Sequence, residues 1–500
     1  MIRTRIAPSP TGDDIHIGNL YTALINWAFA KKNNGKFIIR IEDTDRTRFR
    51  EGAEDKILSS LKAYGLNYDE GPDNKGPFEP YRQSERLHLY KTYAEQLVAE
   101  EKAYYCICTP ERLSRLREEL INKKQIPRYD KLCLQNAQSV KKKIQNGERF
   151  VIRLNVTPGR KISFTDLIRG EITFDSSQID DQVLLKSDGY PTYHLGVVVD
   201  DYLMQITHII RAEEWISSTP KHIILYESLG WPLPIFAHVP ILRNPDKSKL
   251  SKRKNPVWAS WYLNEGYLSE AVLNYLMLMG WSHPEQKEIF NIEEFINKFR
   301  LEDINAVGPV FDLTKLTWMN QQYIQNLTKY EFIKKLKEFY PSTPVILNEA
   351  KDPKIIRLTP QNDDLLSKLF PLLHERMQTL KDFDNLAGHF FISPNITPRD
   401  EKEKKITIDL KEELSKLPDW QKDEILQILR GILQKYEIRM PVLYYLLTGK
   451  EKGLPLPESL EILGKEKTLE RLTSTESKSH SAIATLLTLT LWTFAALTLS

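Results

Sequence analysis

The sequence predicts an α/β fold: a parallel sheet flanked by helices, carrying an α+β insertion and followed by an all-helical part. Strand-like and helix-like segments alternate in the N-terminal region, which is typical of a parallel sheet. Mixed short elements then extend to Asp188, and from Pro256 onward apolar residues recur with helical spacing. A chain of 500 residues exceeds one hydrophobic core, so we expect several domains.

The composition is that of an ordinary soluble globular protein, with 41% apolar and 27% charged residues. Because 70 basic and 67 acidic residues leave a net charge of +3, any nucleic-acid surface must be a local patch. Three cysteines exclude a disulfide scaffold and indicate a reducing compartment. Met1 leads into a strand without the apolar core of a signal peptide, so we expect a cytoplasmic protein.

The first strand covers residues 2–6, and a loop rich in proline and glycine leads into a helix that begins at Ile17 and ends near Gly35. Such a junction makes an anion site when free backbone N–H groups and the helix dipole point outward. His16 and Gly18 lie at this junction, where the histidine can donate to a phosphate and the glycine allows close approach. On spacing alone, a helix cap and an ordinary loop remain the alternatives.

A second strand covers residues 37–41 and ends in an acidic cluster that begins at Glu42, and a helix follows over residues 52–64. Parallel sheets bind ligands beyond the carboxyl ends of their strands. We therefore expect the opening loop and Glu42 to lie at the same edge of the sheet.

A helix over residues 81–100 precedes the insertion, which extends to Asp188 and holds every cysteine. The sheet is predicted to resume with strands at residues 194–200 and 208–211. A helix over residues 220–229 follows.

A polar loop over residues 246–254 contains five cations, Lys247, Lys249, Lys252, Arg253 and Lys254. One interpretation is a solvated charged loop or a nucleic-acid patch. The other is a mobile loop whose ammonium groups neutralise the charge that develops on a transferring phosphate.

The remaining pattern is helical, with apolar stripes at residues 268–279, 330–340 and 425–436 and a domain change predicted near Leu327. The last stretch, residues 481–500, carries no charge and is long enough to span a bilayer. A tail anchor, a packed terminal element and a non-native end from a reading-frame slip are the three interpretations. Its alternating threonine and leucine are poor for a spanning helix, so we expect no stable membrane association.

As an ordered set, the motifs of residues 2–472 resemble those of bacterial glutamyl-tRNA synthetases, which are class I aminoacyl-tRNA synthetases. His16-Ile17-Gly18 matches the class signature His-Ile-Gly-His, and Lys249-Leu250-Ser251-Lys252-Arg253 is similar to the Lys-Met-Ser-Lys-Ser loop. The other motifs are Ala7-Pro8-Ser9-Pro10-Thr11-Gly12, Arg40-Ile41-Glu42-Asp43-Thr44-Asp45, Gly71-Pro72, Tyr81-Arg82-Gln83-Ser84, the segment Leu185 to His194, and Arg211-Ala212-Glu213-Glu214-Trp215.

The resemblance implies a monomeric glutamate–tRNA ligase. Such an enzyme activates L-glutamate with ATP and Mg²⁺ to glutamyl-adenylate and transfers the acyl group to the terminal adenosine of the tRNA for glutamate. One alternative is an enzyme that also charges the tRNA for glutamine. Another is a catalytically silent tRNA-binding protein, which the intact signature residues argue against.

The resemblance also implies the site residues. His16, Gly18, Lys249 and Lys252 would act in catalysis and, with Pro8 and Asn19, bind ATP. Arg5, Ala7, Ser9, Glu42, Tyr193 and Arg211 would bind glutamate. Arginines suit a carboxylate because their planar fork binds it bidentately, and Glu42 suits the α-ammonium group. Val197 stands where relatives commonly have a small polar residue, so one polar contact is expected to be missing.

The implied domains are two halves of a Rossmann-type catalytic domain, an inserted domain, a helical stem-contact domain and a helical anticodon-binding domain. Their expected ranges are 1–105 and 189–255 for the catalytic halves, 106–188 for the insertion, 256–327 for the stem and 328–475 for the anticodon domain, with an atypical apolar tail over 476–500.

Cys106, Cys108 and Cys133 resemble three of the four zinc ligands that some relatives carry in the inserted domain. The usual fourth ligand, a histidine, is Gln135 here, and the insertion contains no histidine. Structural zinc sites usually have four nitrogen or sulfur ligands. The cysteines therefore indicate descent from a zinc-bearing form more than present zinc occupancy.

Overall fold

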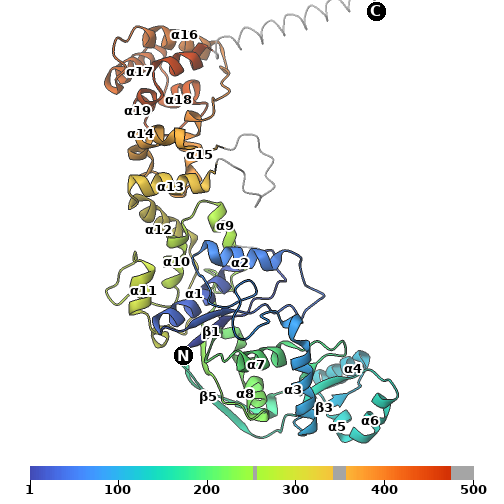
Figure 1. The fold of residues 1–500 in the computed structure, drawn as a ribbon. Coiled ribbons are helices and arrows are strands. Elements are labelled where there is room, and N and C mark those ends of the chain that lie inside the picture. The colour runs from blue at the N-terminus through green and yellow to red at the C-terminus, as the bar shows by residue number, and fades with distance from the viewer. Residues whose placement is uncertain (252–255, 342–355, 474–500) are drawn as a thin grey trace, which may run out of the picture. The chain divides into compact units, whose positions relative to one another are not determined.

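The computed structural model describes residues 1–251, 256–341 and 356–473 (Figure 1). These residues form two compact units, residues 1–264 with 269–316, and residues 265–268 with 317 onward. Lys252, Arg253, Lys254 and the predicted tail over 481–500 lie outside the described residues.

The first unit is built on strand–helix–strand repeats with parallel strands. Strands β1 (Arg3–Ile6) and β2 (Lys36–Ile39) pair in parallel and are joined by helix α1 (Ile17–Lys32). Strands β8 (His208–Ala212) and β9 (Ile235–Val239) also pair in parallel and are joined by helix α8 (Thr219–Ser228). The Thr207 N–H donates to the Arg3 carbonyl at 3.0 Å, so β1 lies beside the start of β8.

Two further strands extend this arrangement beyond the prediction. Strands β5 (Lys161–Asp166) and β6 (Gly170–Asp175) form an antiparallel hairpin, and β5 also pairs in parallel with β9, which gives the order β6-β5-β9-β8. The sheet is therefore mixed. Assigning all of residues 106–188 to a separate insertion is wrong for this hairpin. Burial alternates along β5, so one face of this strand is buried. An alternating pattern does not reveal which sheet the strand joins.

The strand predicted over residues 194–200 is also wrong, because these residues belong to helix α7 (Tyr193–Leu203). The helix buries seven consecutive residues, from Leu195 to Asp201. A helix that is buried on all sides has no amphipathic period, and its β-branched run resembles a buried strand.

The rest of the insertion has a small core of its own. Strands β3 (Ala103–Cys106), β4 (Val151–Leu154) and β7 (Val183–Leu185) form an antiparallel sheet. Tyr104, Cys106, Tyr129, Cys133 and Val140 pack together beside it. Its helices are α4 (Pro110–Asn122), α5 (Leu132–Gln135) and α6 (Ala137–Gln145).

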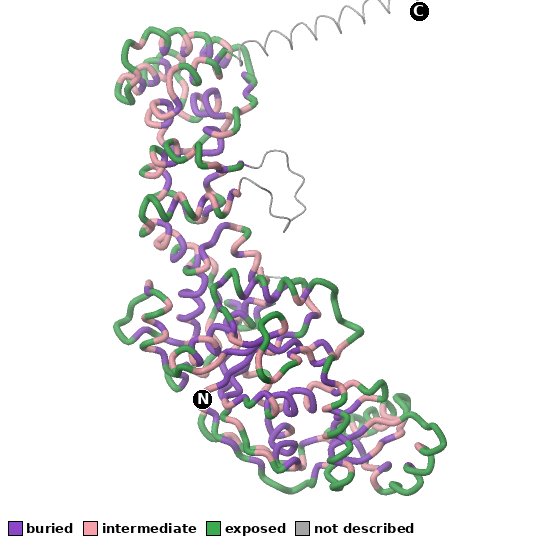
Figure 2. Tube along the Cα trace, viewed as in Figure 1, coloured by how far each residue is buried: buried purple, intermediate pink, exposed green. Residues whose placement is uncertain are grey.

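The remaining helices of the first unit complete its layers. Buried residues run through β1, β2, β8 and α7, so the core lies along the strands (Figure 2). The helices are α2 (Ala53–Ala63), η1 (Gln83–Arg86), α3 (Leu87–Ala99), η2 (Ser176–Gln178), η3 (Glu213–Ser218), α9 (Ala259–Asn264), α10 (Ser269–Met277), α11 (Ile292–Lys298) and η4 (Leu301–Asp303). Helix α12 (Leu313–Gln325) continues into the second unit.

The second unit is all-helical over its described residues, as predicted. Thr328 begins α13 (Lys329–Phe339) with a capping box to Glu331. None of the described helices is long and apolar enough to span a membrane. The other helices are η5 (Pro360–Asn362), α14 (Asp363–Leu373), α15 (Asp382–Ala387), η6 (Gly388–Phe390), α16 (Glu401–Ser415), α17 (Lys422–Tyr436), α18 (Met440–Thr448) and α19 (Leu456–Leu463).

Candidate active site

A cavity of about 870 Å³ opens in the first unit where strands β1, β2 and β8 end. This is the edge at which parallel strands present ligand-binding loops. All six residues predicted to bind glutamate line the cavity, and so do Pro8 and Asn19 of the predicted ATP site. His16, Gly18 and Lys249 are not among the lining residues, and Lys252 lies outside the described chain.

Backbone hydrogen bonds hold the loop after β1 against the residues after β2. The Arg40 N–H donates to the Ile6 carbonyl at 3.1 Å, and the Glu42 N–H donates to the Pro8 carbonyl at 3.0 Å. The Ser9 hydroxyl donates to the Glu42 carbonyl at 2.8 Å. These bonds keep Ser9 and Glu42 on the same wall of the cavity.

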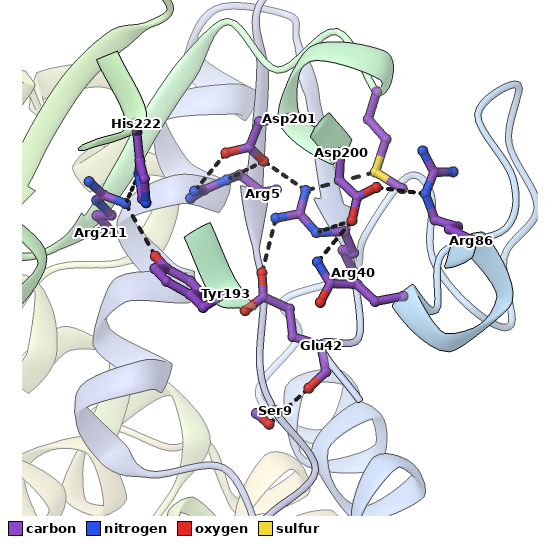
Figure 3. Close-up of polar contacts among 12 residues, drawn as sticks. Arg5, Ser9, Arg40, Glu42, Arg86, Tyr193, Asp200, Asp201, Arg211 and His222 are labelled. Atoms are coloured by element: carbon purple, nitrogen blue, oxygen red, sulfur yellow. Dashed lines mark hydrogen bonds and ion pairs between the residues drawn. The ribbon is translucent and has the colours of Figure 1, made fainter. Parts of the chain in front are cut away.

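Arg5 enters the cavity from β1 and is paired beneath it with a buried carboxylate. Asp201 accepts from Arg5 Nε at 3.0 Å and Nη2 at 3.1 Å, and from Arg40 Nη1 at 2.7 Å (Figure 3). Asp201 is therefore shared by two guanidinium groups, and Nη1 is the nitrogen of the Arg5 guanidinium that does not take part in this pairing.

Asp200, the neighbour of Asp201, has a second set of partners on the other side of Arg40. Its carboxylate accepts from Arg86 Nε at 2.7 Å, Gln83 Nε2 at 2.9 Å and the Tyr90 hydroxyl at 2.8 Å. This buried network was missed from the sequence. The sequence feature that could have indicated it is the pair Asp200 and Asp201 directly after an apolar run. Buried charged residues must be paired, so two carboxylates in this position predict cationic partners.

Glu42 faces the cavity, and its carboxyl group is a weaker acid than an ordinary glutamate. Its Oε1 accepts from Arg40 Nη2 at 3.1 Å. Burial raises the pKa of Glu42 to about 7, although the Arg40 charge opposes the rise. The group therefore changes charge near neutral pH.

Arg211, at the end of β8, uses all five of its N–H donors on protein acceptors. Nε donates to His238 Nε2 at 3.1 Å, and Nη1 donates to the Tyr193 hydroxyl and to His222 Nδ1, both at 3.2 Å. Nη2 donates to the Thr219 hydroxyl at 2.9 Å and the Trp215 carbonyl at 3.3 Å. The predicted bidentate fork is thus occupied, and a ligand must exchange with one of these partners, of which Tyr193 and Trp215 line the cavity.

His16 is the N-cap of α1: its Nδ1 accepts from the Gly18 N–H at 3.0 Å. The Ile17 N–H donates to the Val257 carbonyl at 2.7 Å, and the Asn19 N–H to the His16 carbonyl at 2.8 Å. The expectation of free backbone N–H groups at this helix start is therefore wrong. Gly18 serves the cap, because a Cβ there would lie 3.2 Å from His16 Nδ1.

The segment after the lysine loop is joined to the opening loop. Besides the bond from Ile17 to Val257, the Ala259 N–H donates to the Ile15 carbonyl at 3.0 Å. Before the undescribed residues, Lys249 Nζ contacts Glu214 Oε2 at 2.5 Å, and Glu214 lines the cavity. The structure thus brings both ends of the lysine loop to the edge of the site.

Three cations at the cavity were missed from the sequence: Arg46, Arg48 and Lys186. Lys186 Nζ donates to the Thr44 carbonyl at 3.3 Å. Val197 also lines the cavity and offers no polar group, as expected. The high density of charged residues after Glu42 was the sequence feature that could have indicated Arg46 and Arg48.

The three cysteines meet in the insertion, with ligand atoms within 4.8 Å of one another. The hydroxyl of Tyr129 lies 3.2 Å from Cys108 Sγ and 3.6 Å from Cys106 Sγ, and it accepts from the Cys133 N–H at 3.0 Å. A tyrosine oxygen therefore lies beside the three thiols, which the sequence pattern did not indicate.

Comparison with known families covers nearly the whole chain. Residues 1–318 match the family model described as class I tRNA synthetases (E and Q), catalytic domain. Residues 331–475 match the model of an anticodon-binding domain.

Individual relatives agree with these matches. A glutamate–tRNA ligase of Acidothermus cellulolyticus is 43% identical over 490 residues, 94% of each chain. One from Fusobacterium nucleatum is 42% identical and covers 96% of this chain and 98% of its own. The crystal structure of an Elizabethkingia meningosepticum glutamate tRNA ligase in complex with its amino acid superposes with a TM-score of 0.77 at 33% identity, covering 95% of this chain and 99% of that one.

Proposed function

The chain belongs to the glutamate–tRNA ligases, class I aminoacyl-tRNA synthetases that join glutamate to tRNA, and we propose that the cavity at the ends of β1, β2 and β8 is its active site. The observation that carries the proposal is the gathering of Arg5, Glu42, Tyr193 and Arg211 around one cavity. Glutamate has two carboxylates and one ammonium group, and these side chains provide opposite charge for both kinds of group.

Within this cavity, Arg211 and Arg5 attract the carboxylate of the glutamate side chain. The Glu42 carboxylate binds the α-ammonium group, and Ala7 and Ser9 form the adjacent wall. Charged hydrogen bonds of this kind are the strong ones in a partly buried site. The α-carboxylate is then left as the nucleophile.

ATP, as its Mg²⁺ complex, is proposed to lie over Pro8, His16, Gly18 and Asn19. An oxygen of the α-carboxylate attacks the α-phosphorus, and pyrophosphate leaves with the electrons of the cleaved bond. Because His16 Nδ1 serves the helix cap, any contact of His16 with a phosphate is made through Nε2. Lys249 and Lys252 stabilise the negative charge that develops during this displacement.

In the second step, a hydroxyl of the terminal adenosine of the tRNA attacks the acyl carbon, and AMP leaves. The helices matched as an anticodon-binding domain support recognition of the tRNA for glutamate. An enzyme that also charges the tRNA for glutamine is the alternative. The family resemblance further implies a monomer, which sedimentation equilibrium measures directly.

The test is glutamate-dependent exchange between ATP and pyrophosphate, with and without tRNA. We expect exchange that depends on glutamate and on the tRNA for glutamate. An enzyme that shows no exchange under either condition contradicts the proposed site. Charging of purified glutamine tRNA would favour the non-discriminating alternative.

We also propose that the insertion binds a structural zinc ion through Cys106, Cys108, Cys133 and Tyr129. Three thiolates and a phenolate around Zn²⁺ leave a net negative charge. Two guanidinium groups lie beside the cluster: Arg112 Nη1 is 3.5 Å from Cys108 Sγ, and Arg153 stacks 4.5 Å from the ring centre of Tyr129. When bound, the ion would cross-link β3 with α5.

Replacing Tyr129 with phenylalanine should weaken zinc binding by about 100-fold, because one of four ligands is lost. Elemental analysis of the purified protein and competition with a chelator measure the effect. Gln135→Ala is the matched control, since it changes the position that the sequence indicated for the fourth ligand. Zinc loss in the Gln135 variant and not in the Tyr129 variant would contradict this ligand set.

The pH dependence of glutamate use should follow Glu42. Only the ionised carboxyl binds the α-ammonium group, and burial raises its pKa to about 7. The value of kcat/KM for glutamate should therefore rise as pH increases through about 7, with a slope approaching tenfold per pH unit below it. Glu42→Gln should have a lower kcat/KM with little change over the same range. A wild-type profile that is flat between pH 6 and 8 would be inconsistent with this role.

A further inference from the structure

Arg211 differs from the other buried arginines around the site in the partners that hold it. Arg5, Arg40 and Arg86 each pair with Asp200 or Asp201. Arg211 is only 5% exposed, and its five acceptors are all neutral when the two imidazoles are neutral. Its positive charge is therefore held at the cavity wall, and no carboxylate among the described residues forms an ion pair with it.

The tautomer of one of these imidazoles is determined by a carboxylate behind it. Asp166 Oδ2 lies 2.6 Å from His238 Nδ1, and it also accepts from the His238 backbone N–H at 3.0 Å. A carboxylate can only accept, so Nδ1 carries the proton and Nε2 presents its lone pair to Arg211 Nε. Asp166 itself is anchored by the Ile168 N–H at 3.0 Å and the Arg169 N–H at 3.1 Å.

The second imidazole is fixed in a similar way. His222 Nδ1 faces Arg211 Nη1, and its Nε2 faces His194 Nδ1 at 3.1 Å. Since the arginine donates, Nδ1 accepts and Nε2 carries the proton. Burial lowers the pKa of His222 far below its ordinary value and the pKa of His238 to about 4, so both rings are neutral at physiological pH.

We propose that Asp166 and His238 are positioning residues that fix the guanidinium of Arg211 while leaving its charge available for the side-chain carboxylate of glutamate. A carboxylate in direct contact would fix the guanidinium equally well, but it would also cancel the charge that attracts the substrate. An imidazole placed between Asp166 and Arg211 transmits the orientation without that ion pair. The inference rests on the proposed function, because it takes glutamate as the ligand of Arg211.

Asp166→Asn tests the tautomer. The amide is the same size, but its nitrogen can donate to His238 Nδ1, which then places a proton on Nε2 opposite the Arg211 Nε–H. We expect KM for glutamate to rise by about tenfold or more and KM for ATP to stay within about twofold. Asp175→Asn, at the exposed end of β6, is the matched control and should behave as wild type.

A pair of His238 variants separates positioning from packing. His238→Gln carries an amide that can donate to Asp166 and accept from Arg211, so it should keep KM for glutamate within about threefold of wild type. His238→Leu fills space without an acceptor, so it should resemble Asp166→Asn. Equal KM values for glutamate in the two variants, or equal rises in the KM values for glutamate and ATP, would overturn the proposal.

A measurement on the wild-type chain tests the proposal even if the variants fail to fold. Histidine ¹⁵N NMR of the full-length enzyme should show a neutral ring protonated at Nδ1 for His238, and a ring protonated at Nε2 would overturn the proposal. Wild-type exchange activity tests the proposed function separately. An active wild type whose Asp166→Asn variant has an unchanged KM for glutamate refutes this inference alone.

Discussion

Replacing Arg211 with glutamine should lower kcat/KM for glutamate by about 10³-fold, since removing one partner of a buried, hydrogen-bonded charge pair costs about 2–5 kcal/mol. KM for ATP should change little, because Arg211 donates to Tyr193, Trp215, Thr219 and two histidines, none of which belongs to the proposed ATP site. Steady-state exchange kinetics with glutamate and ATP varied in turn measure both constants.

Arg211→Lys separates charge from geometry. Lysine keeps the positive charge but has three donors on a flexible stem, so it cannot satisfy the five acceptors around the guanidinium. We expect an intermediate loss. Arg160→Gln, which changes an exposed arginine that pairs with Glu227, is the control. If Arg211→Gln retained the wild-type kcat/KM, glutamate would not be bound by this arginine.

The parts of the site that were predicted are those carried by short, ordered motifs. Arg5 and Glu42 lie at strand ends, where alternation and acidic residues are visible in the sequence, and Tyr193 and Arg211 followed from the family resemblance. All four line the cavity. Motifs contain information on residues that are close in the sequence. They therefore predicted best those site residues whose position is determined by the strand that carries them.

The parts that were missed depend on contacts between distant segments. Asp201 pairs with Arg5 across 196 positions of the chain, and Asp166 meets His238 across 72. The prediction of a strand over residues 194–200 concealed the first pair, because it placed Asp201 just after a strand and not inside a buried helix. The error at the start of α1 has the same origin, since the acceptor of the Ile17 N–H is Val257.

The Asp201 pairing leads to the second large effect. Asp201→Asn should lower the free energy of unfolding of the first unit by about 3–5 kcal/mol, because it leaves two buried guanidinium groups facing a neutral amide. The side chain of Arg40 is 0% exposed, and its Nε lies 3.6 Å from Asp200 Oδ2, so its guanidinium cannot reach solvent when Asp201 is neutralised. Denaturant unfolding followed by tryptophan fluorescence measures the change.

The effect should also depend on pH, in a direction that identifies its cause. Burial alone would raise the pKa of Asp201, but the charges of Arg5 and Arg40 outweigh it and lower the pKa below the ordinary value for aspartate. The stabilisation is therefore fully present above that ordinary value and is lost as pH falls through the lowered one. Asp201→Asn should lose less stability than wild type over the same acidic range. Asp55→Asn, on the exposed first turn of α2, should match wild type in both respects, and an Asp201→Asn variant as stable as this control would show that the buried network is not held together by that carboxylate.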